Sequence, residues 1–99
     1  MKVVITGAAN SDLIAIGEFI RPHNPARAAS FVQELLDHCH DLTSMPRAFP
    51  LVPRYEHWNI RRRVHGAYLI FYRIDGDVIE IIHVLNGAQD YESLLFPGN

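Results

Sequence analysis

Three strand-like runs in the second half of the chain constrain its fold more than any other feature. Residues 59–65, 68–74 and 78–85 are rich in β-branched and aromatic side chains, and glycine-containing connections separate them. Asp75 and Gly76 stand between the last two runs. An Asp-Gly pair favours a type I′ hairpin turn because both residues tolerate a positive φ. The pattern therefore predicts an antiparallel β-meander over residues 58–85.

The turn at Asp75 and Gly76 also predicts the register of the second hairpin. The expected opposite pairs are Arg73 with Val78, Phe71 with Glu80, and Leu69 with Ile82. One face then carries aromatic and aliphatic side chains that we expect to pack on helices. These are Tyr68, Ile70, Tyr72, Ile79, Ile81 and His83.

The opposite face of this hairpin is also largely apolar. It carries Leu69, Phe71 and Ile82, with Arg73 and Glu80 within diagonal reach of each other. An antiparallel sheet with one solvated face normally alternates cleanly between apolar and polar residues. We therefore expect a partner to cover this face. The alternative is that the C-terminal tail folds over it.

The start of the chain has the pattern of a strand followed by a helix. Residues 3–5 are β-branched and precede Gly7, which indicates a short strand. Apolar side chains then recur at helical spacing over residues 9–20. Asn10 and Ser11 can cap this helix.

A second helix is predicted to begin at Asn24 and Pro25, because Asn suits the cap and Pro the first helical position. Its apolar stripe extends to about residue 41, and the short connection predicts an antiparallel helical hairpin. We expect residues 91–96 to form a short helix or a tail. The chain is thus expected to be one α+β domain, residues 1–99. Its order is β-α-α-β-β-β with a short terminal helix, and the helical hairpin packs on an antiparallel sheet.

Composition excludes several classes of protein. Apolar residues make up 48% and charged residues 20%, and the net charge of -2 offers no bulk attraction for nucleic acid. Cys39 is the only cysteine, which excludes an internal disulfide and fits a cytoplasmic protein. It lies on the apolar stripe of the second helix, so we expect it to pack rather than react. No run reaches the roughly 20 apolar residues of a membrane helix, and the histidines lack metal-site spacing.

Several short motifs, in order along the chain, resemble the RelE/ParE family of type II toxins. The second helix opens Asn-Pro-Ala-Arg-Ala at residues 24–28, and the middle strand reads Tyr-Leu-Ile-Phe-Tyr-Arg at residues 68–73. Val-Leu-Asn-Gly-Ala closes the last strand at residues 84–88. Each motif alone is weak, but their order and spacing are specific. The Asn-Pro start and the middle strand resemble the ParE branch more than the RelE branch.

The resemblance implies a toxin held inactive by a cognate, ParD-like antitoxin of the ribbon-helix-helix class. ParE-like toxins are understood to inhibit DNA gyrase by binding, whereas RelE-like toxins cut messenger RNA on the ribosome. A third reading is a degenerate member that binds an antitoxin without being toxic. No cofactor, metal or sequence-specific nucleic acid is implied.

The residues of a RelE-type ribonuclease are largely missing. Where those enzymes carry an Arg after the Tyr of the middle strand, this chain has Leu69. The segment after Gly87 reads Ala-Gln-Asp-Tyr and contains no basic residue, so only Tyr91 matches the family's site. Such a site needs cationic groups to stabilise the charge of the transition state. We therefore favour a non-enzymatic toxin, and a ribonuclease using Arg62, Arg73 and Tyr91 remains the alternative.

Three consecutive arginines, Arg61, Arg62 and Arg63, lie on the first strand of the meander. Because side chains alternate along a strand, at least one must share the apolar outer face. One expectation is that these arginines bind an acidic antitoxin segment or the target. The other is that their charge protects an edge strand from aggregation. The candidate contact residues are Arg61, Arg62, Arg63, Leu69, Phe71, Arg73, Glu80, Ile82 and Tyr91, with Leu94, Leu95 and Phe96 as the apolar tail.

Overall fold

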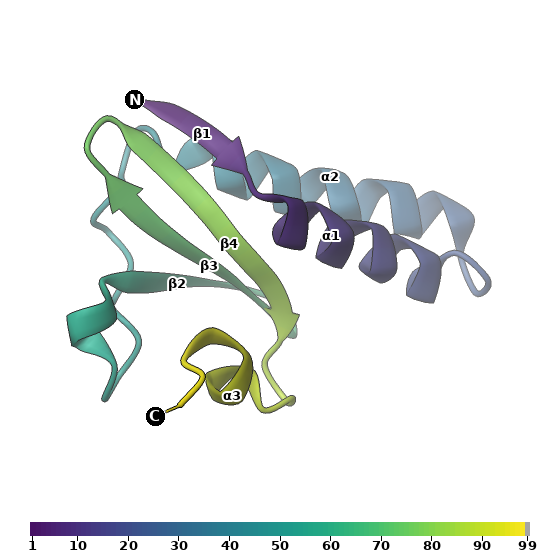
Figure 1. The fold of residues 1–99 in the computed structure, drawn as a ribbon. Helices are drawn as coiled ribbons and strands as arrows, with labels where there is room; N and C mark the ends of the chain where they lie inside the picture. Colours follow the sequence, from purple (N-terminus) through teal and green to yellow (C-terminus); the bar gives the residue numbers. More distant parts are fainter. Residues whose placement is uncertain (99) are drawn as a thin grey trace.

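The structure of the chain, a computed structural model, describes residues 1–98. It contains a strand, two long helices, a three-stranded meander and a short terminal helix, in the predicted order (Figure 1). The elements are β1 (Lys2–Ile5), α1 (Gly7–Ile20), α2 (Pro25–Asp41), the 3₁₀ helix η1 (Glu56–Trp58), β2 (Ile60–His65), β3 (Tyr68–Asp75), β4 (Val78–Asn86) and α3 (Tyr91–Leu95). The predicted α+β class is confirmed.

The four strands form one sheet in the order β1-β4-β3-β2, and the meander is antiparallel as predicted. β1 instead runs parallel to β4, with Lys2 opposite Val78 and Ile5 opposite Ile81. The predicted antiparallel sheet is therefore mixed, with one parallel pair at its edge. The two helices separate β1 from the meander, so no tight turn forces an antiparallel direction on it.

α1 begins earlier than predicted because Thr6, not Asn10 or Ser11, caps it. The Thr6 Oγ1 accepts a hydrogen bond from the backbone N–H of Ala9 at 3.2 Å. The same hydroxyl donates to the carbonyl oxygen of Ile81 at 2.7 Å. One side chain therefore caps the helix and fixes its start against β4.

α2 begins as predicted, with Asn24 as its cap and Pro25 in its first turn. The Asn24 Oδ1 accepts a hydrogen bond from the Arg27 N–H at 3.0 Å. The helices pack closely, since a Cβ on Gly17 would lie 3.4 Å from a methyl carbon of Val32. Both lie on the same side of the sheet, while α3 lies on the other side (Figure 1).

The β3-β4 hairpin turns at Gly76 and Asp77, one residue later than predicted. Asp75 pairs with Val78, and Gly76 has a φ of +58°. A glycine at the first central position is what a type II′ turn requires. The predicted pairs are therefore wrong, and the observed ones are Arg73 with Glu80, Phe71 with His83, and Leu69 with Leu85.

A β-bulge interrupts β4 beside the middle of β3. Tyr72 pairs with Ile81 and Phe71 pairs with His83, so Ile82 has no residue opposite it. A bulge shifts the alternation of side chains. As a result Val84, rather than His83, continues the buried row on the helix side.

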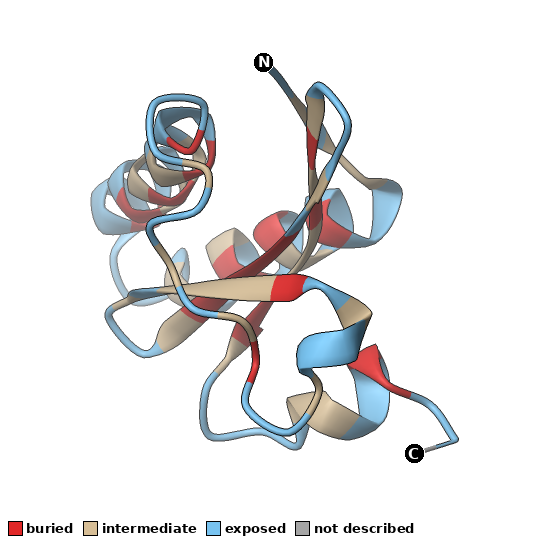
Figure 2. Cartoon of the chain, turned by 90° about the vertical axis from the view of Figure 1, so that its left-hand side faces the viewer, coloured by how far each residue is buried: buried red, intermediate tan, exposed pale blue. Residues whose placement is uncertain are grey.

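The sheet is covered on both faces, and buried residues lie along its strands and on the inward sides of the helices (Figure 2). We call the two buried clusters the helix-side core and the outer core. The helix-side core contains Ala9, Leu13, Ile16, Phe31, Leu35, Cys39, Leu42, Ile70, Tyr72, Ile79, Ile81 and Val84. The outer core contains Val52, Ile60, Leu69, Phe71, Leu85, Leu95 and Phe96.

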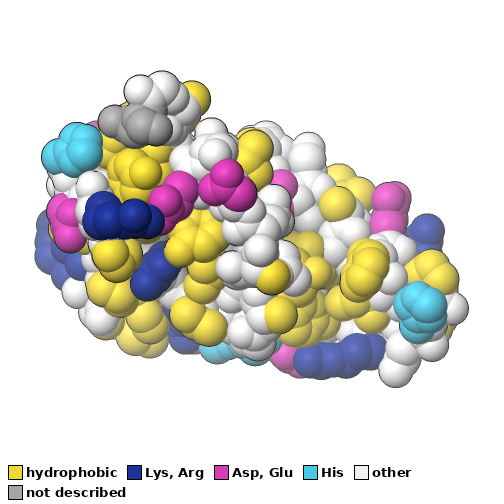
Figure 3. Space-filling view, turned by 90° about the horizontal axis from the view of Figure 1, so that it is seen from below, with side chains coloured by type: hydrophobic (Ala, Val, Ile, Leu, Met, Phe, Trp, Pro, Cys, Tyr) yellow, Lys and Arg dark blue, Asp and Glu magenta, His cyan; other side chains and the backbone are white. Residues whose placement is uncertain are grey.

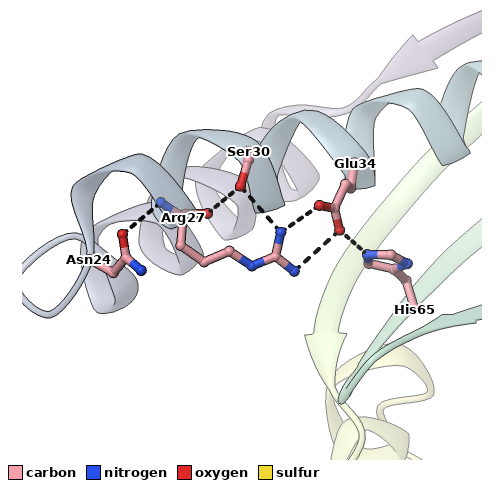
Figure 4. Close-up of polar contacts among 5 residues, drawn as sticks. All are labelled: Asn24, Arg27, Ser30, Glu34 and His65. Carbon is pink, nitrogen blue, oxygen red and sulfur yellow. Dashed lines mark hydrogen bonds and ion pairs between the residues drawn. The ribbon is translucent and has the colours of Figure 1, made fainter.

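A polar network ties the β2-β3 turn to α2 (Figure 4). The Arg27 guanidinium pairs with the Glu34 carboxylate, and His65 Nε2 lies 2.9 Å from Glu34 Oε1. These hydrogen bonds, first that from Arg27 and then that from His65, hold the pKa of Glu34 below its ordinary value. The network therefore joins about two turns of α2 to the tip of the first hairpin.

Asp12 on α1 ties that helix to the bulged part of β4. Its Oδ2 accepts a hydrogen bond from the Val84 N–H at 2.9 Å and lies 2.7 Å from His83 Nδ1. The Asp12 side chain is only 19% exposed. This places His83 at the border of α1, beside the helix-side core rather than within it.

Two further properties concern residues 1–98. No helix in this range is both long enough and apolar enough to cross a membrane. In the same range, His, Cys, Asp and Glu residues do not gather in groups of three or more that could hold a metal ion.

Replacing Asp12 by Ala should lower the free energy of unfolding by about 1–3 kcal/mol, because it leaves the Val84 N–H without its acceptor. Urea unfolding followed by circular dichroism measures this change. Glu18→Ala is the matched control, since Glu18 is an exposed carboxylate on the same helix. Equal stability of the two variants would contradict the assigned role.

Cys39 should be unreactive in the folded protein. It is fully buried, and burial raises the pKa of its thiol to about 12. Because the thiolate is the reactive species, a thiol reagent at pH 8 should label it slowly in buffer and rapidly in denaturant. Fast labelling of the native protein would show that the helix-side core opens readily at this position.

Candidate partner-binding surface

The outer face of the sheet is covered by the protein's own C-terminal segment. Leu69 and Phe71 are 8% and 0% exposed, and both pack in the outer core with Leu95 and Phe96. Of the two coverings considered from sequence, the structure therefore has the tail. α3 and Phe96 already exclude water from Leu69 and Phe71. Contact of these two residues with a partner stays a prediction.

Aromatic rings hold the C-terminal segment in place. The Phe96 ring stacks on Tyr55 with centroids 4.1 Å apart and meets Trp58 edge-on at 5.2 Å. Tyr91 lies against Phe71, with ring centroids 5.0 Å apart. Such pairs add about 0.5–1.5 kcal/mol each beyond the area they bury. Trp58 is thus a packing residue, and the C-terminal segment packs against residues 55–58.

Polar contacts at the rim of the outer core help to orient the C-terminal segment. Arg54 Nη2 lies 2.7 Å from Glu92 Oε2, and Arg62 Nη1 donates a hydrogen bond to the Tyr91 hydroxyl at 2.8 Å. The Arg54 side chain is 75% exposed, so its ion pair contributes little stability. The apolar and aromatic contacts therefore carry most of the attachment.

The three consecutive arginines alternate between the two faces of the sheet. Arg62 reaches Tyr91 on the outer face, which confirms that at least one arginine shares that face. Arg61 and Arg63 point the other way. Arg61 Nη1 donates to the Phe49 carbonyl oxygen at 2.8 Å, and Arg63 Nη1 donates to the His38 carbonyl oxygen at 3.0 Å. Arg61 therefore binds the loop at Phe49, and Arg63 binds the C-terminal part of α2 at His38.

The predicted contact between Arg73 and Glu80 is present. These residues pair directly across β3 and β4, and Arg73 Nη2 lies 2.8 Å from Glu80 Oε1. The contact is direct rather than diagonal because of the shifted turn. Hydrogen bonding to Glu80 raises the pKa of Arg73.

The predicted contact residues therefore fall into two groups. Leu69, Phe71, Leu95 and Phe96 are buried within the chain, whereas Leu94 is 53% exposed. Ile82 and Tyr91 are half-buried beside the outer core. The accessible members of the predicted set are thus Arg73 and Leu94, with the half-buried arginines, Glu80, Ile82 and Tyr91 around them.

An apolar groove lies between α1, the end of β4 and α3. Ile16, Phe19, Leu85 and Leu94 line it, and the Asp12–His83 pair contributes polar atoms to its lining. Phe19 is 72% exposed and Leu94 is 53% exposed. Seen from below, hydrophobic side chains extend from the C-terminal end toward the helices (Figure 3). Exposed apolar surface of this kind makes the groove a candidate interaction site.

Sequence reasoning missed Phe19, although a signal was present. Phe19 and Ile14 lie on α1 outside the buried row formed by Ala9, Leu13 and Ile16. A large apolar side chain outside the core-facing stripe of a helix has no internal partner to pack on. The position of Phe19 outside the buried row of α1, rather than its residue type alone, could have identified the α1 side of the groove.

Replacing Phe96 by Ala should release the C-terminal segment from the sheet. Phe96 is 1% exposed, so we expect a loss of about 3–5 kcal/mol in the free energy of unfolding. Leu94→Ala, in the preceding helix α3, is the matched control, because the Leu94 side chain is 53% exposed and its loss should cost little. Urea unfolding and amide hydrogen exchange of residues 91–96 measure both effects. Similar stability of the two variants would argue against a docked tail.

Comparison with known proteins agrees with this architecture. Residues 3–91 match the sequence profile described as the ParE toxin of the type II toxin-antitoxin system, parDE. A chain from the chromosomal ParDE toxin-antitoxin system of P. aeruginosa shares the fold, with a TM-score of 0.72 and 20% identity. That similarity covers 87% of this chain and 95% of the other.

A chain of the RelBE2 toxin-antitoxin complex from Mycobacterium tuberculosis is also similar. Its TM-score is 0.64 at 23% identity, covering 86% of this chain and 95% of that one. No curated protein matches. At these identities the solved structures show the fold, while the profile match over nearly all of the chain shows the family. The protein belongs to the ParE toxin family of type II toxin-antitoxin systems.

Proposed function

We propose that this protein acts in the cytoplasm as a toxin that inhibits DNA gyrase by binding, and that a ParD-like antitoxin neutralises it. The observation that carries the non-enzymatic reading is the position of Leu69. It stands where a RelE-type ribonuclease has an arginine, and it is buried beneath the C-terminal segment. A leucine there cannot stabilise the charge that develops during RNA cleavage.

The arginines near the outer face support the same reading. Arg62 donates to Tyr91, Arg54 pairs with Glu92, and Arg73 pairs with Glu80. Two of these guanidinium groups thus already face carboxylates within the chain. A cleavage site needs cationic groups that are free to converge on a phosphate.

A ribosome-dependent ribonuclease remains the second candidate because one observation favours it. The structure brings Arg62 and Tyr91, two of the three residues named for that activity, to within 2.8 Å of each other. An arginine beside a tyrosine hydroxyl could hold a phosphate next to a proton-transfer group. Arg73 is not part of this contact, and its partner is Glu80.

The antitoxin is proposed to use the groove between α1, the end of β4 and α3. Phe19 and Leu94 provide the exposed apolar surface there. An amphipathic segment that lays its apolar side chains into such a groove gains burial without disturbing either core. This arrangement would leave the buried Leu69 and Phe71 in place.

Expression of the chain without an antitoxin should arrest growth, and the purified protein should inhibit supercoiling by gyrase while messenger RNA stays intact. Mapping of RNA ends in the same cells separates the two mechanisms. Cleaved transcripts with unaffected supercoiling would establish the ribonuclease instead. Normal growth combined with retained antitoxin binding would identify a non-toxic family member.

Phe19→Asp should weaken the complex with the antitoxin, encoded beside the toxin, by at least tenfold, because it places a charge in the apolar groove. Co-purification and isothermal titration calorimetry measure the loss. Met45→Asp is the control, since Met45 is an exposed apolar residue outside this groove. If both variants bind like the unchanged protein, the antitoxin occupies another surface.

A further inference from the structure

A second hollow lies at the opposite end of the β2-β3 pair, away from the apolar groove. Its volume is about 410 Å³, and it is lined by Arg47, Leu51, Asn59, Arg61, Arg73, Ile74 and Asp75. This volume falls within the range of roughly 300–1,000 Å³ that small-molecule sites occupy. Neither the family comparison nor the proposed function assigns a role to it.

Three arginines and one asparagine are among the residues that line this hollow. Arg61 is held by its contacts with main-chain oxygens, at 2.8 Å to Phe49 and 3.4 Å to Arg47. These bonds use only its Nη1 atom, so its other N–H donors stay available. Within residues 1–98, the side chains of Arg47 and Asn59 make no hydrogen bond or ion pair. The residues that line the hollow therefore include several N–H donors without a protein acceptor.

The charges around the hollow remain positive after its acidic neighbours are counted. Glu80 pairs with Arg73, and Asp75 lines the hollow and lies near Arg73 as well. Arg47 and Arg61 face no carboxylate in the lining other than Asp75. A net positive site on a chain of net charge -2 concentrates its attraction for anions at one place.

The donor types favour a phosphate over a carboxylate. Arginine presents a planar fork of N–H groups that binds anionic oxygens in pairs. Two such forks and an amide offer more donors than the two oxygens of a carboxylate can accept, whereas a phosphate ester offers more oxygens. Leu51 and Ile74 add apolar wall on which a sugar or base can rest.

We propose that this hollow binds the phosphate of a nucleotide, either free or within a single strand, through Arg47, Arg61 and Asn59. Arg73 forms the side of the site and keeps its contact with Glu80. The binding is a property of the toxin chain itself and does not depend on gyrase inhibition. A toxin that failed to inhibit gyrase could still bind the nucleotide, and the reverse also holds.

The test is a titration of the full, isotope-labelled chain with AMP, adenosine, inorganic phosphate and a short single-stranded oligonucleotide, followed by NMR. AMP should shift the resonances of Arg47, Asn59 and Arg61, and adenosine should not. Arg47→Gln should weaken AMP binding by about tenfold, as expected for a lost charge-assisted contact. The affinity should also fall as salt rises. An oligonucleotide that binds more tightly than AMP identifies a strand as the source of the phosphate, whereas equal affinity identifies the free nucleotide.

Arg21→Gln is the matched control. It removes the same charge, and Arg21 is an exposed arginine at the C-terminal end of α1. Arg47→Lys keeps the charge but loses the fork, so it should bind AMP with intermediate affinity. Three results would overturn the proposal. These are equal shifts with adenosine, equal loss of affinity in Arg21→Gln and Arg47→Gln, or displacement of AMP by a glutamate-rich peptide at the same concentration.

Discussion

The burial of β3 on both of its faces is the constraint on which the rest of the structure depends. Ile70 and Tyr72 face the helices and Leu69 and Phe71 face the other way, yet all four are nearly inaccessible to water. A strand of this kind needs two separate coverings, because each exposed apolar face costs about 25 cal/mol for every Å² in contact with water. The helical hairpin supplies one covering and the C-terminal segment the other. The tail is therefore part of the fold, whatever else it contacts.

The helices and strands could be predicted because their signals are local. Asn24 and Pro25 mark a helix start within two residues, and alternation along β2 put one arginine on the outer face without knowledge of the register. The register itself was one residue off at the turn, since Gly76 can occupy either central position and only long-range packing decides between them. The pairing of β1 with β4 joins residues far apart in sequence, and no local pattern reports such a contact.

In the candidate site, too, local sequence predicted some features and long-range packing decided the others. The sequence contained both an apolar sheet face and an apolar tail, so covering by a partner and covering by the tail were both open. What decides for the tail is ring packing around Phe96, which involves Tyr55 and Trp58 from a different segment. The apolar surface that stays accessible lies instead on α1, at Phe19, and on Leu94. The apolar surface that we propose for a partner thus lies at the border between the sheet and the helices rather than in the middle of the sheet.

Because Trp58 contacts Phe96 edge-on, its fluorescence reports on the position of the C-terminal segment. Trp58 is the only tryptophan, and its indole Nε1 is buried without a hydrogen-bond partner among residues 1–98. Its emission therefore depends on whether Phe96 stays seated beside it, and lifting the tail would expose the indole to water and move the spectrum to longer wavelength. A partner that displaces the tail can be distinguished from one that leaves it in place by fluorescence alone, without any label.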